Sequence, residues 1–315
     1  MTAASRTGTA MIFPGMGPTP FAEVGKFMVI NPFARKLVAT ADRVLGYSLL
    51  DRYRQTEGDY SEYAQVAFMV NSLALAQWAG HTLGIEAELC TGPSFGEKPV
   101  AAFSGALDFA DAVRATAGFA RLLEDYFSTE HTDLVTHSFV RVPENELRTV
   151  LAELDEHGET YEMSCYIDDD FHMLTLREHN LEWLKPRLRA LGGMSLYSMR
   201  PPMHCSAFDG LRARAEEEVF GPLEFTDPRL PVVADQDGSL ITTGEGVRTM
   251  LLDSCVRPMR WPAVVDALCE AGIGTVCVAG QDSLFGRVRR TTAAFEVVPV
   301  TPRIALLPRP QPARA

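Results

Sequence analysis

A serine set between two glycines carries the most reactive spacing in the sequence. The segment Gly92-Pro93-Ser94-Phe95-Gly96 fits the pattern G-x-S-x-G, in which a sharp strand-to-helix turn exposes the serine hydroxyl beside a helix N-terminus. A short strand pattern at 85–90 precedes the motif and a helical pattern at 97–103 follows it, as such a turn requires. Short patterns of this kind also arise by chance. The motif therefore identifies Ser94 as a candidate nucleophile.

A serine hydroxyl is a weak nucleophile at neutral pH and needs a base nearby, most often a histidine. Of the seven histidines, His204 lies in the proline-stiffened segment Pro201-Pro202-Met203-His204-Cys205-Ser206. That segment suits a site base and a buried loop histidine equally well. The other histidines lie in charge-rich surroundings that predict surface positions (His131, His157, His172, His179), at a helix end (His81), or at a position that the pattern leaves undecided (His137).

The elements that must position these residues alternate between strands and helices. Apolar runs predict strands at 9–13, 232–234 and 275–278, and an alternating segment predicts one at 85–90. Helical spacing predicts helices at 63–78, 97–103, 109–127, 208–219 and 245–255. This alternation implies a largely parallel sheet covered on both faces. Between about 131 and 191 the charge rises and the order becomes strand, helix, strand, strand, helix. That order is typical of a small α+β layer, which 194–197 would complete.

Composition limits the classes of function. The 315 residues, 46% apolar and 22% charged, have an ordinary globular composition. A formal charge of -12 has the wrong sign for a nucleic-acid partner. No apolar run approaches the roughly 20 residues of a membrane helix and no signal-peptide pattern opens the chain, so we expect a cytoplasmic protein without membrane contact. Six scattered cysteines predict reduced thiols and no metal site.

Several motifs, in order along the chain, resemble those of the acyl-CoA and acyl carrier protein transacylases, the family of malonyl-CoA:acyl carrier protein transacylase and of polyketide acyltransferase domains. The family's F-P-G-Q-G is matched by 13–17, its G-H-S-x-G-E by 92–97, its loop histidine by His204 and its P-V-R-W by 258–261. The resemblance implies an α/β fold. It consists of an α/β-hydrolase-like large subdomain with a parallel sheet (1–136 and 199–315) and an inserted ferredoxin-like small subdomain (137–198).

The resemblance also implies a Ser-His dyad without an acidic third member. Ser94 would take the acyl group as an ester and His204 would move the proton. Transfer to the phosphopantetheine thiol of a carrier protein would complete a ping-pong cycle with no bound cofactor. By the same resemblance the main-chain N–H groups of Met16 and Phe95 would hold the oxyanion. A main-chain carbonyl near Ser254, which replaces the family's glutamine, would orient the imidazole.

Three departures from the family pattern concern the substrate pocket, at Phe119, Pro93 and Met203. Phe119 stands where relatives carry the arginine that binds the carboxylate of malonyl groups through a bidentate salt bridge. Burying that carboxylate unpaired would cost on the order of several kcal/mol. Pro93 replaces a histidine, and the segment ending in Met203 replaces the family's substrate-sorting residues. These changes predict a less polar pocket that rejects malonyl and accepts an acyl chain without a terminal carboxylate.

Within the family, the chain is most similar to a discrete acyltransferase of macrolactam biosynthesis, in 13–17, in 92–97 and in the lost arginine. This implies transfer of a dipeptidyl or aminoacyl group between two acyl carrier proteins in polyketide antibiotic biosynthesis, by an enzyme that we expect to be monomeric. An acidic enzyme must present basic groups to acidic carriers. The family resemblance places the carrier contacts at Arg287, Arg289 and Arg290 and on the small subdomain. There the candidates are Arg141 and Met194, the latter at a position where many relatives carry a basic residue.

Three alternatives stay open at this point. An acyl hydrolase that clears stalled carrier proteins would use the same ester intermediate and release it to water. A malonyl-type acyltransferase would share the dyad but need a pocket that accepts a carboxylate. A catalytically inactive binding module would be consistent with the departures at Met16, Pro93 and Ser254.

Overall fold

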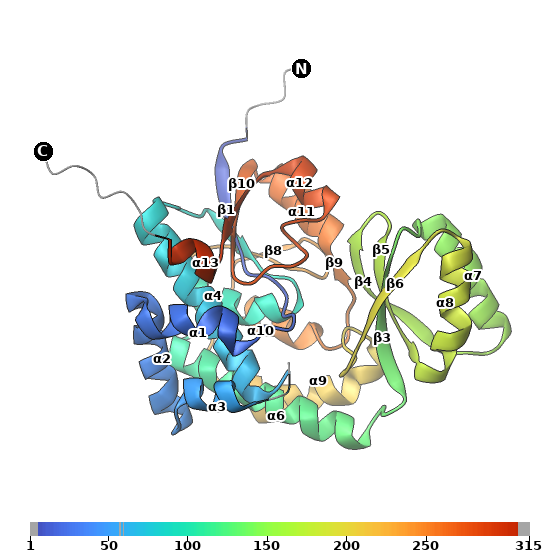
Figure 1. Ribbon diagram of the computed structural model, residues 1–315, viewed down its shortest axis with the longest axis horizontal. Helices are drawn as coiled ribbons and strands as arrows, with labels where there is room; N and C mark the ends of the chain where they lie inside the picture. Colours follow the sequence, from blue (N-terminus) through green and yellow to red (C-terminus); the bar gives the residue numbers. More distant parts are fainter. Residues whose placement is uncertain (1–5, 57, 59, 308–315) are drawn as a thin grey trace, which may run out of the picture.

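The computed structural model describes residues 6–56, 58 and 60–307 (Figure 1). Its larger sheet has six strands in the order β11-β10-β1-β2-β7-β8. All neighbours are parallel except the last pair. The strands are β1 (Gly8–Ile12), β2 (Leu89–Thr91), β7 (Val232–Val233), β8 (Leu240–Ile241), β10 (Ile273–Ala279) and β11 (Glu296–Val300). The predicted parallel sheet is confirmed.

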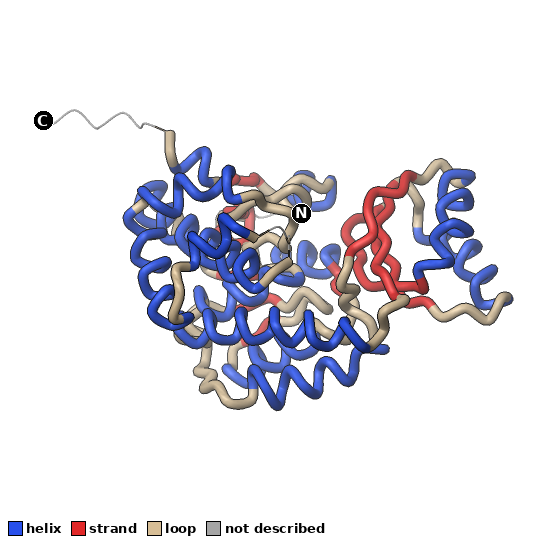
Figure 2. The backbone as a smooth tube through the Cα atoms, turned by 60° about the horizontal axis from the view of Figure 1, so that its bottom comes forward, coloured by secondary structure: helices blue, strands red, loops and turns tan. Residues whose placement is uncertain are grey.

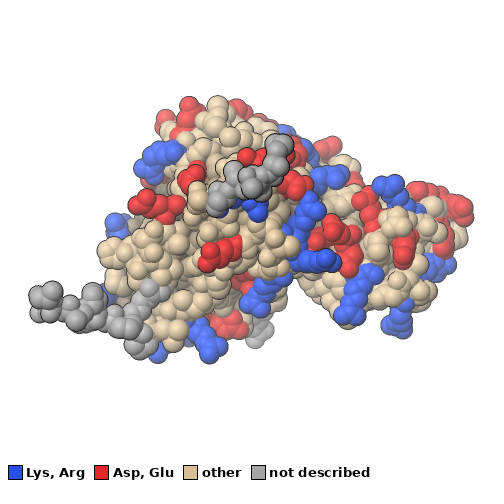
Figure 3. Space-filling view, turned by 90° about the horizontal axis from the view of Figure 1, so that it is seen from above, with Lys and Arg blue, Asp and Glu red and all other residues tan. Residues whose placement is uncertain are grey.

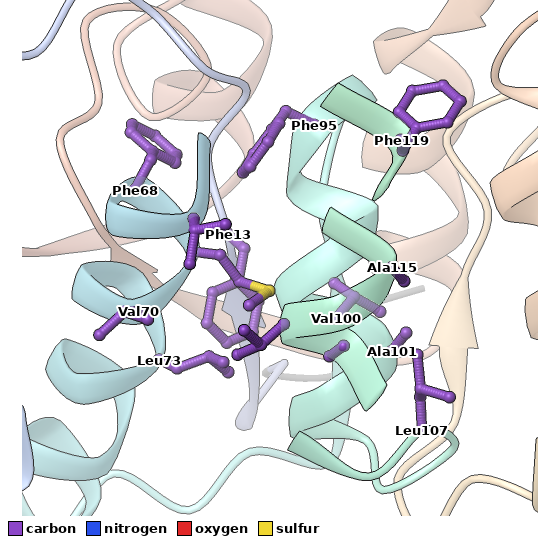
Figure 4. Close-up of a cluster of buried hydrophobic side chains, with 14 of the residues drawn as sticks. Phe13, Phe68, Val70, Leu73, Phe95, Val100, Ala101, Leu107, Ala115 and Phe119 are labelled. Carbon is purple, nitrogen blue, oxygen red and sulfur yellow. The ribbon is translucent and has the colours of Figure 1, made fainter. Parts of the chain in front are cut away.

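Helices cover both faces of this sheet, because successive strand residues point to opposite sides. Met11 joins one buried cluster and Ile12 the other. The helices are α1 (Phe21–Ile30), α2 (Pro32–Leu45), α3 (Leu49–Gln55), α4 (Glu62–Leu83), α5 (Glu97–Phe103), α6 (Phe109–Thr129), α9 (Asp209–Ala215), α10 (Gly244–Asp253), α11 (Trp261–Glu270), α12 (Arg289–Ala294) and α13 (Pro302–Ala305). Part of the first cluster, between α4, α5 and α6, is drawn in Figure 4. In the described part of the chain, no helix has the length and apolar character to cross a membrane.

Residues 134–199 form a second body, which we call the small lobe. Its strands are β3 (Leu134–Val140), β4 (Tyr161–Asp168), β5 (Phe171–Arg177) and β6 (Met194–Met199), and its helices are α7 (Glu144–Glu156) and α8 (Leu181–Ala190). The strand order is β6-β3-β5-β4, extended by β9 (Met259–Arg260) from the main body. The four lobe strands pair antiparallel, and both helices pack on one face of their sheet (Figure 2). The expected ferredoxin-like layer is confirmed.

One surface expectation is wrong. His172 lies on β5, a central strand, and its side chain is buried. The charged residues around it in sequence misled the prediction, because neighbours along a strand point to opposite faces. His137 is also buried, on β3, where its ring nitrogens contact the hydroxyls of Ser198 and Ser195 at 2.9 and 3.0 Å.

Candidate active site

The carboxyl ends of two parallel strands bring the first two motifs together. β1 and β2 are neighbours in register, with Ile12 opposite Thr91, so the segments that follow them leave the sheet side by side. Ser94 sits in the turn after β2 with φ of +54°, a left-handed conformation that costs a non-glycine residue energy. Gly96 is required there because a Cβ would overlap the carbonyl oxygen of Phe13. The sequence pattern thus produces the expected sharp turn at 92–96, which we call the elbow.

His204 reaches Ser94 from a different part of the chain. Its Nε2 lies 2.8 Å from Ser94 Oγ, and the imidazole is only 1% exposed. The loop that carries it follows β6 and is held by the small lobe. The N–H of Met203 donates to Thr136 Oγ1 at 3.4 Å, and Ser206 Oγ donates to Glu162 Oε2 at 2.6 Å. The structure therefore brings together the two residues predicted as nucleophile and base.

The surroundings of His204 keep its ring neutral. Burial lowers the pKa of His204 from 6.5 to about 4, the Lys98 ammonium acts in the same direction, and the backbone of Ser254 and Arg257 opposes them. Within the described part of the chain, Nδ1 has no partner in hydrogen-bonding geometry, although the Ser254 backbone lies close enough to favour the protonated ring. A neutral imidazole whose Nε2 faces a hydroxyl is in the form that accepts a proton.

A buried pair of carboxyl groups supports the elbow from behind. The main-chain N–H of Ser94 donates to Asp235 Oδ2 at 2.5 Å, and Gln236 Nε2 donates to Glu97 Oε1 at 2.7 Å. Burial raises the pKa of Asp235 to about 6. Burial and the neighbouring Asp235 charge raise the pKa of Glu97 well above its usual range, and hydrogen bonds with Gln236 and Ser254 oppose them. Nothing in the sequence pattern pointed to Asp235 or Gln236, which follow β7.

Two main-chain N–H groups suit the expected oxyanion site. In the described residues, neither the N–H of Met16 nor that of Phe95 donates to a protein acceptor. Both residues line the same cavity as Ser94. Replacement of the family's glutamine by Met16 leaves a backbone donor in place. No cluster of three His, Cys, Asp or Glu side chains capable of holding a metal ion occurs in the described residues.

The cavity beside Ser94, which we call the chamber, is mostly apolar. Its wall combines residues of the elbow, of α4, α6 and α10, and of the His204 loop, including Met16, Gln65, Ser94, Phe95, Lys98, Phe119, Leu123, Met203, Phe220, Leu251 and Ser254. Phe119 and Met203, which the sequence assigned to a substrate pocket, both lie in this wall. Pro93 does not: it is buried behind the elbow, where its carbonyl accepts the Gly96 N–H at 2.9 Å.

Sequence reasoning missed a cation in the chamber. Lys98 Nζ lies 4.6 Å from the ring centroid of Phe95 and 4.7 Å from that of Phe119. Phe95 itself lies between Phe68 of α4 and Phe119 of α6 (Figure 4). Burial lowers the pKa of Lys98 to about 8. The one available signal was a lysine in the first turn of a helix, where acidic residues are preferred. The prediction of a less polar pocket is therefore incomplete.

The residues expected to contact carrier proteins lie at the surface, with one exception. Met194 is 45% exposed on β6, and Arg141, Arg287 and Arg289 are exposed. Arg290 is instead held by Asp266 at 2.7 Å and by Asp169 at 3.7 Å. Figure 3 shows basic side chains gathered where the small lobe meets the main body, with acidic side chains among them.

Comparisons with known proteins identify relatives along most of the chain. The family model "VinK acyltransferase small domain" matches residues 138–199. The mitochondrial malonyl-CoA-acyl carrier protein transacylase of Mus musculus is 24% identical over 286 residues, which is 83% of this chain and 72% of that protein. The malonyl CoA-acyl carrier protein transacylase of Escherichia coli K12 is 22% identical over 274 residues, covering 85% of this chain and 87% of the relative.

Solved structures share the whole fold. FabD from Acinetobacter baumannii superposes with a TM-score of 0.82 at 17% identity, covering 95% of each chain. A malonyl-transacylase in complex with its type II polyketide synthase acyl-carrier protein gives 0.83 at 21% identity, covering 93% of this chain and 96% of that one. Together with the matched motifs and the type of the small lobe, these likenesses show that the chain resembles the malonyl-CoA:acyl carrier protein transacylases over most of its length.

Proposed function

We propose that the chain is a trans-acting acyltransferase that moves an acyl group between two acyl carrier proteins through an ester on Ser94. The observation that carries this proposal is the 2.8 Å contact between Ser94 Oγ and His204 Nε2 at the wall of the chamber. In the described residues, no carboxylate hydrogen-bonds the imidazole, which agrees with a two-residue dyad. The strained serine is supported by Asp235, outside the proton path.

The geometry supports two half-reactions. In the first, Ser94 Oγ attacks the thioester carbon while His204 Nε2 accepts the hydroxyl proton, and the main-chain N–H groups of Met16 and Phe95 stabilise the oxyanion. The carbon–sulfur bond breaks, and the departing phosphopantetheine thiolate takes the proton from His204. In the second half-reaction, the thiol of the acceptor carrier gives its proton to His204 and attacks the ester, which releases Ser94 Oγ to be reprotonated.

The acyl group that we propose is dipeptidyl or aminoacyl, without a terminal carboxylate, as in macrolactam polyketide biosynthesis. The match of the small lobe to the VinK type and the ring of Phe119 in the chamber wall support this choice. Phe119 is 3% exposed and packs 5.8 Å from the Phe220 ring, so an arginine side chain has no room there without rearrangement. Arg121 does not replace the lost charge, because it pairs with Glu62 at 2.7 Å.

The carrier proteins would dock where the small lobe meets the main body. The exposed side chains of Arg141, Met194, Arg287 and Arg289 support this placement. Arg290, held in its ion pair with Asp266, would add only to the electrostatic potential around this docking surface. A relative of the same fold was solved with its acyl-carrier protein bound. The proposed setting is the cytoplasm, where free thiols such as the six cysteines stay reduced.

A panel of loaded carrier proteins tests the proposal. The protein is mixed with carriers bearing dipeptidyl, aminoacyl, hexanoyl or malonyl groups, and its intact mass is measured. We expect an adduct on Ser94 from the dipeptidyl or aminoacyl carrier, none from the malonyl carrier, and none at all with Ser94→Ala. Phe119→Arg should gain at most weak malonyl loading, because the surrounding pocket also departs from the family pattern. Efficient malonyl loading of the wild type would overturn the proposed acyl class.

The same experiment separates the alternatives. An acceptor carrier added to the acylated protein should receive the acyl group, and the ester should persist without the acceptor. Release of free acid at the same rate with and without the acceptor would identify a hydrolase. Absence of any adduct, under conditions that label an active relative, would identify a binding module.

A further inference from the structure

Lys98 occupies a position that disfavours a lysine in three ways. It lies in the first turn of α5 (Glu97–Phe103), where the partial positive charge of the helix N-terminus repels a cation. Its ammonium is largely withdrawn from water, which lowers its pKa to about 8. No carboxylate in the described part of the chain forms an ion pair with it, although the adjacent Glu97 lines the same cavity and acts to raise the pKa of Lys98. Residues that violate local preferences in this way mark functional positions.

The chamber is where this cation points. Its Nζ lies over the ring faces of Phe95 and Phe119, and all three side chains line the cavity beside Ser94. Ring faces attract a cation, but they offer no oxygen or nitrogen atom to accept its hydrogen bonds. An ammonium carries three N–H donors, and in the described residues no protein acceptor takes one. Lys98 is also the only basic residue on the described chamber wall.

We propose that Lys98 Nζ binds an oxygen acceptor of the acyl group while that group is carried on Ser94. The inference rests on the proposed function, because it needs an acyl chain in the chamber. An amide carbonyl of a dipeptidyl or acylated aminoacyl group is the source that the wall suits best. Gln65 and Ser254 line the same cavity and offer acceptors for the amide N–H. A carboxylate accepts up to about four hydrogen bonds, and a single ammonium would leave most of them unmade.

The residue therefore selects acyl groups by their chemistry. An apolar chain fits the rings and aliphatic side chains but leaves the ammonium desolvated and without an acceptor. A chain with a carbonyl at the right depth replaces the water that the ammonium loses. Hydrogen bonds to charged groups contribute more than neutral ones, so the preference should be large enough to measure as a ratio of rates.

A matched pair of acyl groups tests the proposal. N-acetyl-β-alanyl and hexanoyl have the same number of chain atoms, but only the former carries an amide. Carriers bearing each group, and a malonyl carrier as a third arm, are reacted with the wild type and with Lys98→Met, and kcat/KM for the Ser94 ester is measured by intact mass. Lys98→Gln provides a second uncharged variant if Lys98→Met does not fold. Lys98→Arg keeps the charge and serves as the conservative control.

The ratio of N-acetyl-β-alanyl to hexanoyl loading is the readout. Removal of the ammonium also raises the pKa of His204, but that effect is common to all donors and cancels in the ratio. We expect the ratio to fall about 10- to 100-fold in Lys98→Met, and to recover partly in Lys98→Arg. An equal ratio in wild type and Lys98→Met overturns the inference while leaving the acyltransferase intact.

Two other outcomes are equally decisive. In one, Lys98→Met loses loading from the malonyl carrier but keeps loading from the other two carriers. Lys98 would then bind a carboxylate oxygen, and the proposal that the natural acyl group lacks a terminal carboxylate would be overturned. If no carrier acylates the wild type, the proposed function fails, and the role of Lys98 fails with it.

Discussion

Lowering the pH tests most directly how His204 is prepared for proton transfer. Burial, helped by the Lys98 ammonium, lowers the pKa of His204 from 6.5 to about 4. This difference corresponds to about 3 kcal/mol of preference for the neutral ring. Activity should depend on the fraction of His204 that is neutral, because only the neutral imidazole can accept the Ser94 proton. A lowered pKa therefore extends activity toward acid pH.

The expected size of the effect is large. At about pH 5.5, an imidazole with the ordinary pKa is about 90% protonated, whereas one with a pKa of about 4 is about 3% protonated. We expect the rate constant for Ser94 acylation to change less than about twofold between about pH 7.5 and 5.5. It should fall steeply only below about pH 5. Lys98→Met should move this acid limb toward neutral pH, because a nearby positive charge is removed.

A single-turnover assay provides the measurement. Hexanoyl-pantetheine is used as the donor, because it has no titrating group in this range and avoids the titration of a carrier protein. The ester is followed by quenching and intact mass. Asp235, whose pKa is about 6, also titrates in this range beside Ser94, so Asp235→Asn is measured in parallel. Half-loss of the rate near pH 6.5 in both wild type and Asp235→Asn would refute this account of His204.

Three further predictions concern the elbow and the carrier surface. Asp235→Leu removes the acceptor for the Ser94 N–H and should lower kcat about 10- to 100-fold. Asp235→Asn keeps an oxygen acceptor and should lower kcat much less. Equal losses of kcat in the two variants would contradict the view that Asp235 positions Ser94. Gly96→Ala, whose Cβ overlaps a carbonyl oxygen, should cost about 3 kcal/mol or more of unfolding free energy in a denaturant titration. Gly80→Ala on α4, whose Cβ would meet the Ile85 carbonyl oxygen at 3.6 Å in ordinary van der Waals contact, should be neutral or stabilise by up to about 1 kcal/mol. Arg287→Glu should raise KM for a loaded carrier about tenfold and leave the kinetics with hexanoyl-pantetheine unchanged. The control Arg303→Glu lies on α13, on the side away from the small lobe (Figure 1), and should change neither. An equal rise of KM in both variants would exclude a docking role for Arg287.

The order of elements and the nucleophile candidate could be predicted because both leave local marks in the sequence. Alternating apolar runs reflect strands and helices, and the glycines around Ser94 reflect a backbone that only glycine permits. His204 needed the family pattern, since its loop spacing alone suited two interpretations. Ser94 and His204 are then joined by a contact across 110 residues of chain, which no local pattern encodes.

The rest of the site depends on packing between distant segments. Asp235 supports Ser94 across 141 residues, and Glu162 holds the His204 loop from another strand. Lys98 was visible beside the motif, but the direction of its side chain depends on the rings of Phe95 and Phe119. The sequence showed that the family's arginine is missing at position 119, but it did not show that Lys98 brings another positive charge to the chamber wall.

The anchors of the His204 loop have a mechanical consequence. Thr136 and Glu162 belong to the small lobe, whereas Ser94 is mounted on the large sheet. The distance across which the proton moves is thus an alignment between two separately packed bodies. If a carrier protein binds the outer strand of the small lobe, as proposed, any shift of that lobe would also move His204 relative to Ser94.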